Sequence, residues 1–337
     1  MVSAKKREAL RAALVIRTVV VAAWFSASLR AADQPASHIY KSTDQGRSWS
    51  QSDSGLPTQG RVNALTAFGK AILAGTDSGI FVSHDSGQKW TAIPGTTRDL
   101  GKVTSFASFG RTLYAGTHQS GVFASTDEGK TWKALNNGLG DRNVRSLLSW
   151  RETLYAGTDT QGVFRSQDGG RTWIRFNQGI PSEAQVFALE AVGNRIFAGL
   201  YRNGLYRWDG QQSWVKVGRI LPLVLASIGD TLVAGQNSGG IHWSTDSGET
   251  WNAGLADQAR TPRGSPGLPP DAPVWSAAGG NGQVFAGAFD GIYYSNDKGR
   301  TWSRAEAGLP AASPGISFLV TDQFVLAASL IETAEVP

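Results

Sequence analysis

The stretch STDEGKTW, from Ser125 to Trp132, occurs with small changes at six places in the chain. The six copies are STDQGRSW (42–49), SHDSGQKW (83–90), STDEGKTW (125–132), SQDGGRTW (166–173), STDSGETW (244–251) and SNDKGRTW (295–302). A seventh, degenerate copy, RWDGQQSW, occupies 207–214. The seven tryptophans follow one another at intervals of 41, 42, 41, 41, 37 and 51 residues. A repeat of about 40 residues is typical of the blades of a β-propeller.

A second pattern repeats in step with the first and divides each unit into four strand-sized pieces. In the first complete unit these pieces are VNALTAFG, AILAGT, GIFVS and the segment that contains the tryptophan. We name them strands A to D, and no helical periodicity of useful length interrupts them outside the N-terminal segment.

The chain begins with strands C and D, at 39–40 and at Trp49, and ends with strands A and B, at 316–320 and 324–329. Pairing the strands at the two chain ends leaves neither end with an unpaired sheet edge. We therefore predict an all-β, seven-bladed propeller over residues 38–330, closed by C-terminal strands A–B pairing with N-terminal strands C–D in one composite blade. Residues 330–337 are expected to connect strand B to His38.

The octapeptides have the composition of a tight turn followed by a buried anchor. An Asp at the start of a turn accepts hydrogen bonds from backbone N–H groups that follow it, and Gly supplies the left-handed backbone conformation. Each Trp can bury roughly 150–250 Å². We predict a structural role, not a catalytic one, for Asp44, Asp85, Asp127, Asp168, Asp246, Asp297, Trp49, Trp90, Trp132, Trp173, Trp214, Trp251 and Trp302.

Composition excludes several kinds of chemistry. The chain of 337 residues has no Cys and four His, which excludes disulfides, thiolate nucleophiles and cysteine-bound metals. The net charge of +5 comes entirely from residues 1–31, so the remainder has no overall charge that would attract nucleic acid. We expect no cofactor, no metal site and no nucleic-acid partner.

The N-terminal segment has the order of a secretory signal peptide. Residues 1–11 are basic, 18–29 are uncharged and largely apolar, and small residues follow. Twelve apolar residues are too few to span a bilayer comfortably. We predict a signal peptide over 1–32, with an uncleaved N-terminal anchor as the alternative. The mature chain is then an exported monomer, periplasmic or extracellular, without a membrane span.

The octapeptides resemble the Asp-box, or bacterial neuraminidase repeat, of sialidases, xyloglucan-degrading glucanases and sortilin-type receptors. The single ring with a leader is most similar to the photosystem II stability/assembly factor group. This resemblance implies a non-catalytic propeller that binds another protein and assists assembly of an envelope complex. The alternative is a glycan-binding or glycoside-hydrolysing, sialidase-like propeller, although the Phe/Tyr-Arg-Ile-Pro motif of sialidases is absent.

A binding site is expected on one face of the ring. In up-and-down blades the octapeptides and A–B turns share one face, and the B–C turns and D–A linkers share the other, which we call the B–C face. Its loops vary where the scaffold repeats, as binding loops do. The candidate binding residues are Arg61, Lys102, His118, Arg142, Arg145, Tyr201, Arg202, Asn203 and Asp290. A Pro-rich loop is expected as an insertion over 255–273.

Overall fold

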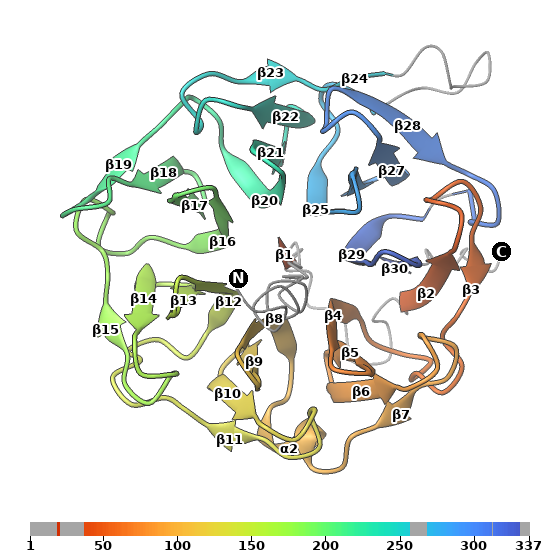
Figure 1. Ribbon diagram of the computed structural model, residues 1–337, viewed down its shortest axis with the longest axis horizontal. Helices are drawn as coiled ribbons and strands as arrows, with labels where there is room; N and C mark the ends of the chain where they lie inside the picture. The colour runs from red at the N-terminus through yellow and green to blue at the C-terminus, as the bar shows by residue number, and fades with distance from the viewer. Residues whose placement is uncertain (1–18, 21–36, 257–267, 312, 331–337) are drawn as a thin grey trace, which may run out of the picture.

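The computed structural model describes residues 19–20, 37–256, 268–311 and 313–330. Seven sheets, each built on four antiparallel strands, stand around a central axis like the blades of a propeller (Figure 1). This confirms the predicted all-β, seven-bladed fold. Of the predicted signal peptide, only β1 (Val19–Val20) is described. It pairs with the axis-facing strand of blade 6, Val19 opposite Ala277, so this part of the chain lies inside the ring.

Each blade contains four strands that run alternately up and down from the axis to the rim. Blade 1 comprises β4 (Val62–Phe68), β5 (Ala71–Thr76), β6 (Gly79–Ser83) and β7 (Thr91–Ala92). Blade 2 comprises β8 (Val103–Phe109), β9 (Thr112–Thr117), β10 (Gly121–Ser125) and β11 (Lys133–Ala134). Blade 3 comprises β12 (Val144–Trp150), β13 (Thr153–Thr158), β14 (Val163–Ser166) and β15 (Ile174–Arg175).

The remaining blades follow the same order around the ring. Blade 4 comprises β16 (Val186–Val192), β17 (Arg195–Leu200), β18 (Gly204–Trp208) and β19 (Trp214–Lys216). Blade 5 comprises β20 (Pro222–Ile228), β21 (Thr231–Gln236), β22 (Ile241–Ser244) and β23 (Asn252–Ala253). Blade 6 comprises β25 (Val274–Gly280), β26 (Gln283–Ala288), β27 (Gly291–Ser295) and β28 (Thr301–Ala305).

Blade 7 is the composite blade that closes the ring. It comprises β29 (Gly315–Val320), β30 (Val325–Leu330), β2 (Ser37–Ser42) and β3 (Ser50–Gln51). The two ends of the propeller join along β30 and β2, from Ser37 opposite Leu330 to Ser42 opposite Val325. The predicted pairing of C-terminal strands A–B with N-terminal strands C–D is therefore confirmed. The predicted connection over 330–337 lies outside the described residues, apart from Leu330 itself.

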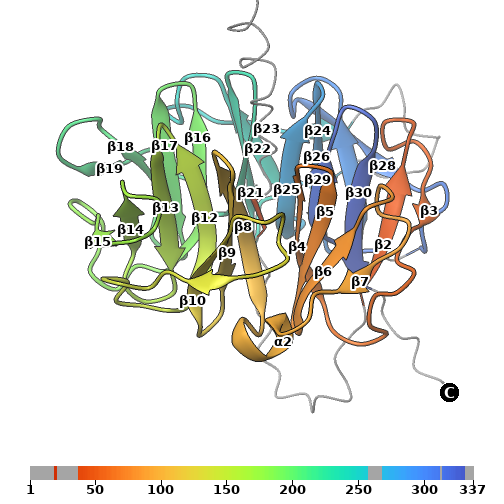
Figure 2. The same cartoon turned by 60° about the horizontal axis from the view of Figure 1, so that its bottom comes forward.

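Two short elements were not expected from the sequence. The helix α2 (Thr96–Asp99) lies in the linker between blades 1 and 2, on the B–C face, at the lower edge of the ring in Figure 2. The strand β24 (Leu255–Ala256) occupies the start of the predicted Pro-rich loop and pairs in parallel with β28. Residues 257–267 of that loop lie outside the described residues, and Leu268 beyond them is buried.

The repeated Ala-Gly-Thr pattern reflects close packing between blades. A Cβ added to Gly75 of β5 would lie 2.6 Å from Cγ1 of Val103 in the next blade, and one on Gly157 of β13 would lie 2.7 Å from Cγ1 of Val186. Such distances are too short for non-bonded carbon atoms. Only glycine at this position lets the inner strand of one blade approach the second strand of its neighbour.

Hydrogen bonds to the Asp carboxylates stabilise the octapeptide turns. Asp127 accepts hydrogen bonds from the Ser125 hydroxyl (2.8 Å) and from the backbone N–H (2.9 Å) and hydroxyl (2.6 Å) of Thr131. Equivalent contacts from the Ser and the N–H groups reach Asp44, Asp85, Asp168, Asp246 and Asp297. We call these octapeptide turns Asp turns. In the degenerate seventh copy Arg207 replaces the first Ser, but Asp209 still accepts from three successive backbone N–H groups.

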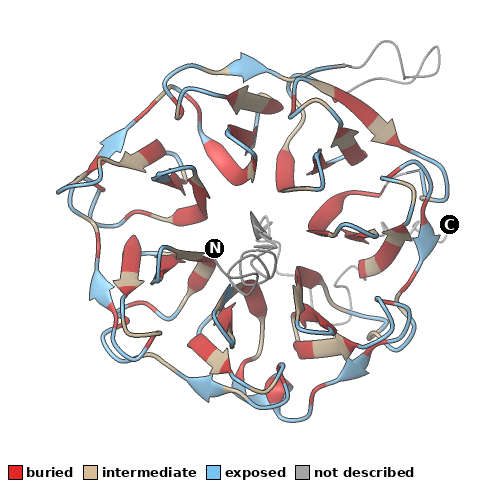
Figure 3. Ribbon diagram, in the orientation of Figure 1, coloured by how far each residue is buried: buried red, intermediate tan, exposed pale blue. Residues whose placement is uncertain are grey.

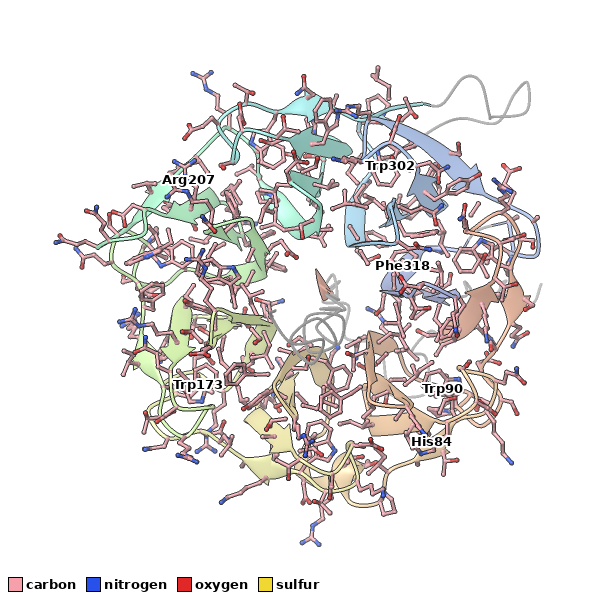
Figure 4. The ribbon with its side chains drawn as sticks, viewed as in Figure 1. His84, Trp90, Trp173, Arg207, Trp302 and Phe318 are labelled. Carbon is pink, nitrogen blue, oxygen red and sulfur yellow. The ribbon has the colours of Figure 1, made fainter. Side chains whose placement is uncertain are left out.

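The Asp-turn tryptophans pack in the outer half of the blades, where Figure 4 labels three of them. Trp49, Trp90, Trp173, Trp214 and Trp302 are buried, whereas Trp132 and Trp251 are partly buried. Strand D was predicted to contain the Trp, but in five blades it begins just after that residue. Apart from β28, whose residues are mostly buried, the outer strands are short and largely exposed, and the strands nearer the axis carry most of the buried residues (Figure 3).

Candidate functional site

The inner strand of every blade carries a β-bulge near its start, at the B–C face. The pairing register with strand B shifts around the second residue of each inner strand. The seven bulge residues, from blade 1 to blade 7, are Asn63, Thr104, Arg145, Phe187, Leu223, Trp275 and Ile316. Bulges redirect side chains and are frequent beside functional sites. The first three are polar and the next four are apolar, so the ring is chemically divided.

The B–C turn of each blade places a second residue next to the bulge, 14 positions later in the sequence. These turn residues, from blade 1 to blade 6, are Asp77, His118, Asp159, Tyr201, Asn237 and Phe289. In five of these blades, a backbone N–H of the turn residue donates to the linker carbonyl of Arg61, Lys102, Asn143, Gln185 or Pro273. In these five blades the backbone hydrogen bond of the turn is therefore the same, while the side chains differ.

We call the charged and polar part of this face, in blades 1 to 3, the polar arc. Asp77 accepts from the Asn63 amide (3.0 Å) and pairs with the Lys102 ammonium (3.1 Å). Asp159 accepts from Nε and Nη2 of Arg145, both at 2.7 Å. These cations and carboxylates neutralise each other within the face, so Lys102 and Arg145 do not form a continuous basic strip.

The surroundings of Asp141 and His118, two further residues of the polar arc, shift the pKa of each side chain. Burial of Asp141 raises its pKa, but hydrogen bonds from Asn143 and Thr160 outweigh this and hold the pKa below its usual range. Burial, aided by the nearby Lys102 ammonium, lowers the pKa of His118, so its imidazole is neutral at pH 7. The polar arc is therefore a network of polar side chains that interact with one another.

We call the opposite part, in blades 4 to 6, the apolar arc. Its bulge residues pair with aromatic turn residues, because the Phe187 and Tyr201 rings lie 5.0 Å apart and those of Trp275 and Phe289 lie 6.2 Å apart. Phe289 is 57% exposed, and Leu221 at the start of blade 5 is 50% exposed. Apolar side chains that are exposed together on one face make that face a candidate contact surface. The two arcs meet where the Arg145 guanidinium lies 4.4 Å from the centre of the Phe187 ring.

Two cavities of about 250 Å³ open on the B–C face. One lies between blades 4 and 5, where Tyr201 and Arg202 face Leu221, Leu223 and Asn237. The other lies under the linker from blade 6 to blade 7. There Arg304 donates to the backbone carbonyls of Asp290 (2.5 Å) and Ala311 (3.0 Å).

The structure places all nine predicted binding residues at the B–C ends of the blades, but it does not gather them. Arg142 is exposed in the linker between blades 2 and 3, and the backbone N–H of Asn203 donates to the Leu200 carbonyl in the turn that holds Arg202. Arg61 contributes its backbone N–H to Asp77 (3.0 Å). Asp290 points inward, accepting from the Tyr293 hydroxyl (2.7 Å).

Of the apolar arc, sequence reasoning selected only Tyr201 as a binding residue. Phe289 precedes Asp290 in the same turn, and an apolar residue in a turn that otherwise carries polar side chains was the available signal. No such signal marked Phe187, Leu223 or Trp275, because each belongs to an apolar strand and only the bulge sets it apart. Within the described ranges, no cluster of three His, Asp or Glu side chains is placed to hold a metal ion. Across the part of the chain that the structure describes, no helix has the length and apolar character needed to cross a bilayer.

Comparisons with known proteins agree on the fold. A family model described as the DUF6242 beta propeller domain matches residues 28–148, a minority of the chain. YCF48 from Cyanidioschyzon merolae has a TM-score of 0.60 at 14% identity, over 81% of this chain and 96% of that one. YCF48 bound to D1 peptide has a TM-score of 0.56 at 15% identity, over 82% and 95%.

An enzyme shares the same architecture. The GH74 xyloglucanase from Xanthomonas campestris has a TM-score of 0.53 at 17% identity, over 89% of this chain and 55% of that one. No curated protein matches the sequence. At these identities the structural likeness shows the fold alone, and both binding proteins and hydrolases have it.

Proposed function

We propose that this chain is a non-catalytic propeller that binds another protein through its B–C face. The observation that carries the proposal is the apolar arc, where Phe289 remains exposed in the B–C turn of blade 6 and the exposed Leu221 lines the cavity between blades 4 and 5. Protein interfaces are built around such apolar and aromatic anchors with a polar rim. The polar arc supplies that rim, and YCF48, which has the same fold, has a structure with D1 peptide bound.

The carboxylates of the polar arc favour binding over hydrolysis. A glycosidase needs one carboxyl group free to donate a proton and a second free to attack or to activate water. Asp77 and Asp159 pair with cations, and Asp141 is held ionised by its hydrogen-bond donors. These three carboxylates act as hydrogen-bond acceptors for their neighbours.

The finer parts of the proposal rest on the sequence. We propose that the octapeptides are Asp-box repeats and that the chain is exported to the periplasm or the exterior by the segment 1–32. Its partner is then a component of an envelope complex whose assembly or stability it assists.

Site-specific photo-cross-linking tests the proposed face. A photoreactive phenylalanine analogue at position 289 should give an adduct with an envelope protein in native cells, because the side chain at this position is exposed. The same analogue at Arg111, which is exposed in the A–B turn of blade 2, is the control and should give no such adduct. If position 289 gives no protein adduct while the purified chain retains glycans on an array, the proposal is wrong.

A further inference from the structure

The cavity between blades 4 and 5 has the size of a site for one side chain. Its volume of about 250 Å³ is below the roughly 300–1,000 Å³ of pockets that enclose small organic ligands. It exceeds the roughly 150 Å³ in which a benzene ring fits. Leu221, Pro222 and Leu223 supply an apolar wall, and the Tyr201 side chain lies at the opposite edge. A Leu, Phe or Tyr side chain therefore suits the space.

Arg202 places a cation at the edge of this cavity. Its guanidinium carbon lies 5.0 Å from the centre of the Tyr201 ring, and its backbone has a φ of +60°. Gln119, at the equivalent position in blade 2, has the same left-handed conformation, so this backbone geometry belongs to the turn itself. Among the described residues no carboxylate pairs with Arg202, unlike Arg145, which pairs with Asp159.

Resting on the proposed function, we infer that this cavity recognises a short segment of the partner polypeptide. An apolar side chain of the segment enters the cavity against Leu221 and Leu223. An Asp or Glu within one or two residues of it accepts hydrogen bonds from the Arg202 guanidinium. Charge complementarity selects an acidic neighbour, since a guanidinium and a carboxylate form two parallel, charge-assisted hydrogen bonds.

The second cavity does not support the same inference, although its volume is equal. Its arginine, Arg304, donates to the backbone carbonyls of Asp290 and Ala311 and thereby fixes the linker above it. Arg202 makes no comparable backbone contact within the described part of the chain, so its guanidinium is oriented only by the Tyr201 ring.

A peptide selection tests the inference. Random 12-residue peptides displayed on phage are selected on the immobilised full chain, and the enriched sequences are synthesised and measured by fluorescence anisotropy. We expect the enriched peptides to share an apolar residue close to an Asp or Glu. Changing that acidic residue to its amide should weaken binding about tenfold. The absence of enriched peptides, or enrichment without acidic residues, overturns the inference.

Two variants locate the binding site. Arg202→Gly should weaken binding about tenfold, and it should abolish the difference between the acidic peptide and its amide. Because glycine suits a positive φ, this variant should keep the melting temperature of the parent chain. Gln119→Gly changes the equivalent turn position in blade 2, where φ is +78°, and should bind the peptide normally. Leu221→Arg, at an exposed position, should close the cavity and prevent binding.

Failure of the inference and failure of the proposed function give different results. If peptides bind Leu221→Arg and Arg202→Gly as well as the parent chain but are lost in Phe289→Arg, the cavity is wrong and the protein-binding face stands. Both the inference and the proposed function are wrong if three results occur together: no peptide binds, position 289 gives no cross-linked protein, and the chain retains glycans on an array.

Discussion

At the scale of single residues, the Asp turns show how one carboxylate can stabilise a turn. The Asp127 carboxylate receives two donors from Thr131 and one from Ser125, all within the octapeptide. Burial raises the pKa of Asp127, but these hydrogen bonds outweigh burial and lower it to about 2. Asp44 and Asp246 show the same balance, and their pKa is also about 2.

Removing one of these carboxylates should cost stability. Asp127→Ala leaves the backbone N–H and hydroxyl of Thr131 without their acceptor, as the loss of a helix cap does, and should lower the free energy of unfolding by about 1 kcal/mol. Chemical denaturation measures this loss. Lys130→Ala changes an exposed side chain in the same turn and is the control. A loss for Lys130→Ala equal to that for Asp127→Ala would contradict the assigned role.

The same carboxylates predict a dependence of stability on pH. A pKa of about 2 in the folded chain at Asp44, Asp127 and Asp246 lies below the value of about 3.9 for an unfolded Asp. Their contribution is therefore fully present above about pH 5 and is lost as the pH falls toward 2. Calorimetry should show a melting temperature that decreases across this window. Asp127→Asn should show a smaller decrease, and an identical decrease would argue against this origin.

At the scale of elements, the linkers fasten each blade to the next through their glycines. In four blades the backbone N–H of the Asp-turn Trp donates to a linker carbonyl of the preceding blade. The pairs, acceptor first, are Ser54 with Trp90 (2.8 Å), Asn137 with Trp173 (2.8 Å), Gln178 with Trp214 (2.7 Å) and Ala307 with Trp49 (2.9 Å). The residue after each acceptor is a glycine with positive φ, where an added Cβ would overlap the Trp carbonyl oxygen.

A single methyl group at such a glycine should loosen the contact between two blades. Gly138→Ala should lower the free energy of unfolding by about 1–3 kcal/mol more than Gly110→Ala, as overpacking does. Both glycines have positive φ, but a Cβ at Gly110 would meet nothing within 4 Å, so the difference isolates the clash with Trp173. Denaturant unfolding gives both values, and equal losses would show that the backbone conformation alone is responsible.

At the scale of the whole molecule, stability depends on closure. The strands β29 and β30 come from the C-terminal end of the propeller, and β2 and β3 come from its N-terminal end. Six residues of β2 pair with β30, so no blade is left with an unpaired inner edge at the junction. Closed rings avoid the exposed strand edges through which sheets aggregate.

Removing β30 should open the ring. A chain that ends at Val320 keeps β29 but leaves β2 without its partner, and we expect aggregation and a melting temperature lower by about 10 °C or more. A chain that ends at Leu330 keeps all of β30 and is the control. Size-exclusion chromatography and calorimetry measure both effects. A monomeric truncated chain with the melting temperature of the control would show that closure is not required.

The octapeptides were sufficient to predict the number of blades and the composite seventh blade. Their hydrogen bonds are local, linking residues two to four positions apart, so a short motif determines each turn wherever it occurs. Because the chain begins with strands C and D and ends with strands A and B, pairing the two ends was the simplest way to leave neither end with an unpaired strand edge. The candidate face also followed from the sequence. Strands that alternate in direction place all the B–C turns and D–A linkers on one side of the ring and all the other turns on the opposite side.

Only the tertiary structure revealed the polar and apolar arcs. Phe187, Leu223 and Trp275 come from three different blades, and in the sequence they resemble any apolar strand residue. A bulge redirects each of them, and the bulge depends on pairing between strands rather than on neighbouring residues. Short-range hydrogen bonds thus let the sequence determine the scaffold, whereas the distribution of polar and apolar groups around the ring depended on contacts between segments far apart in the chain.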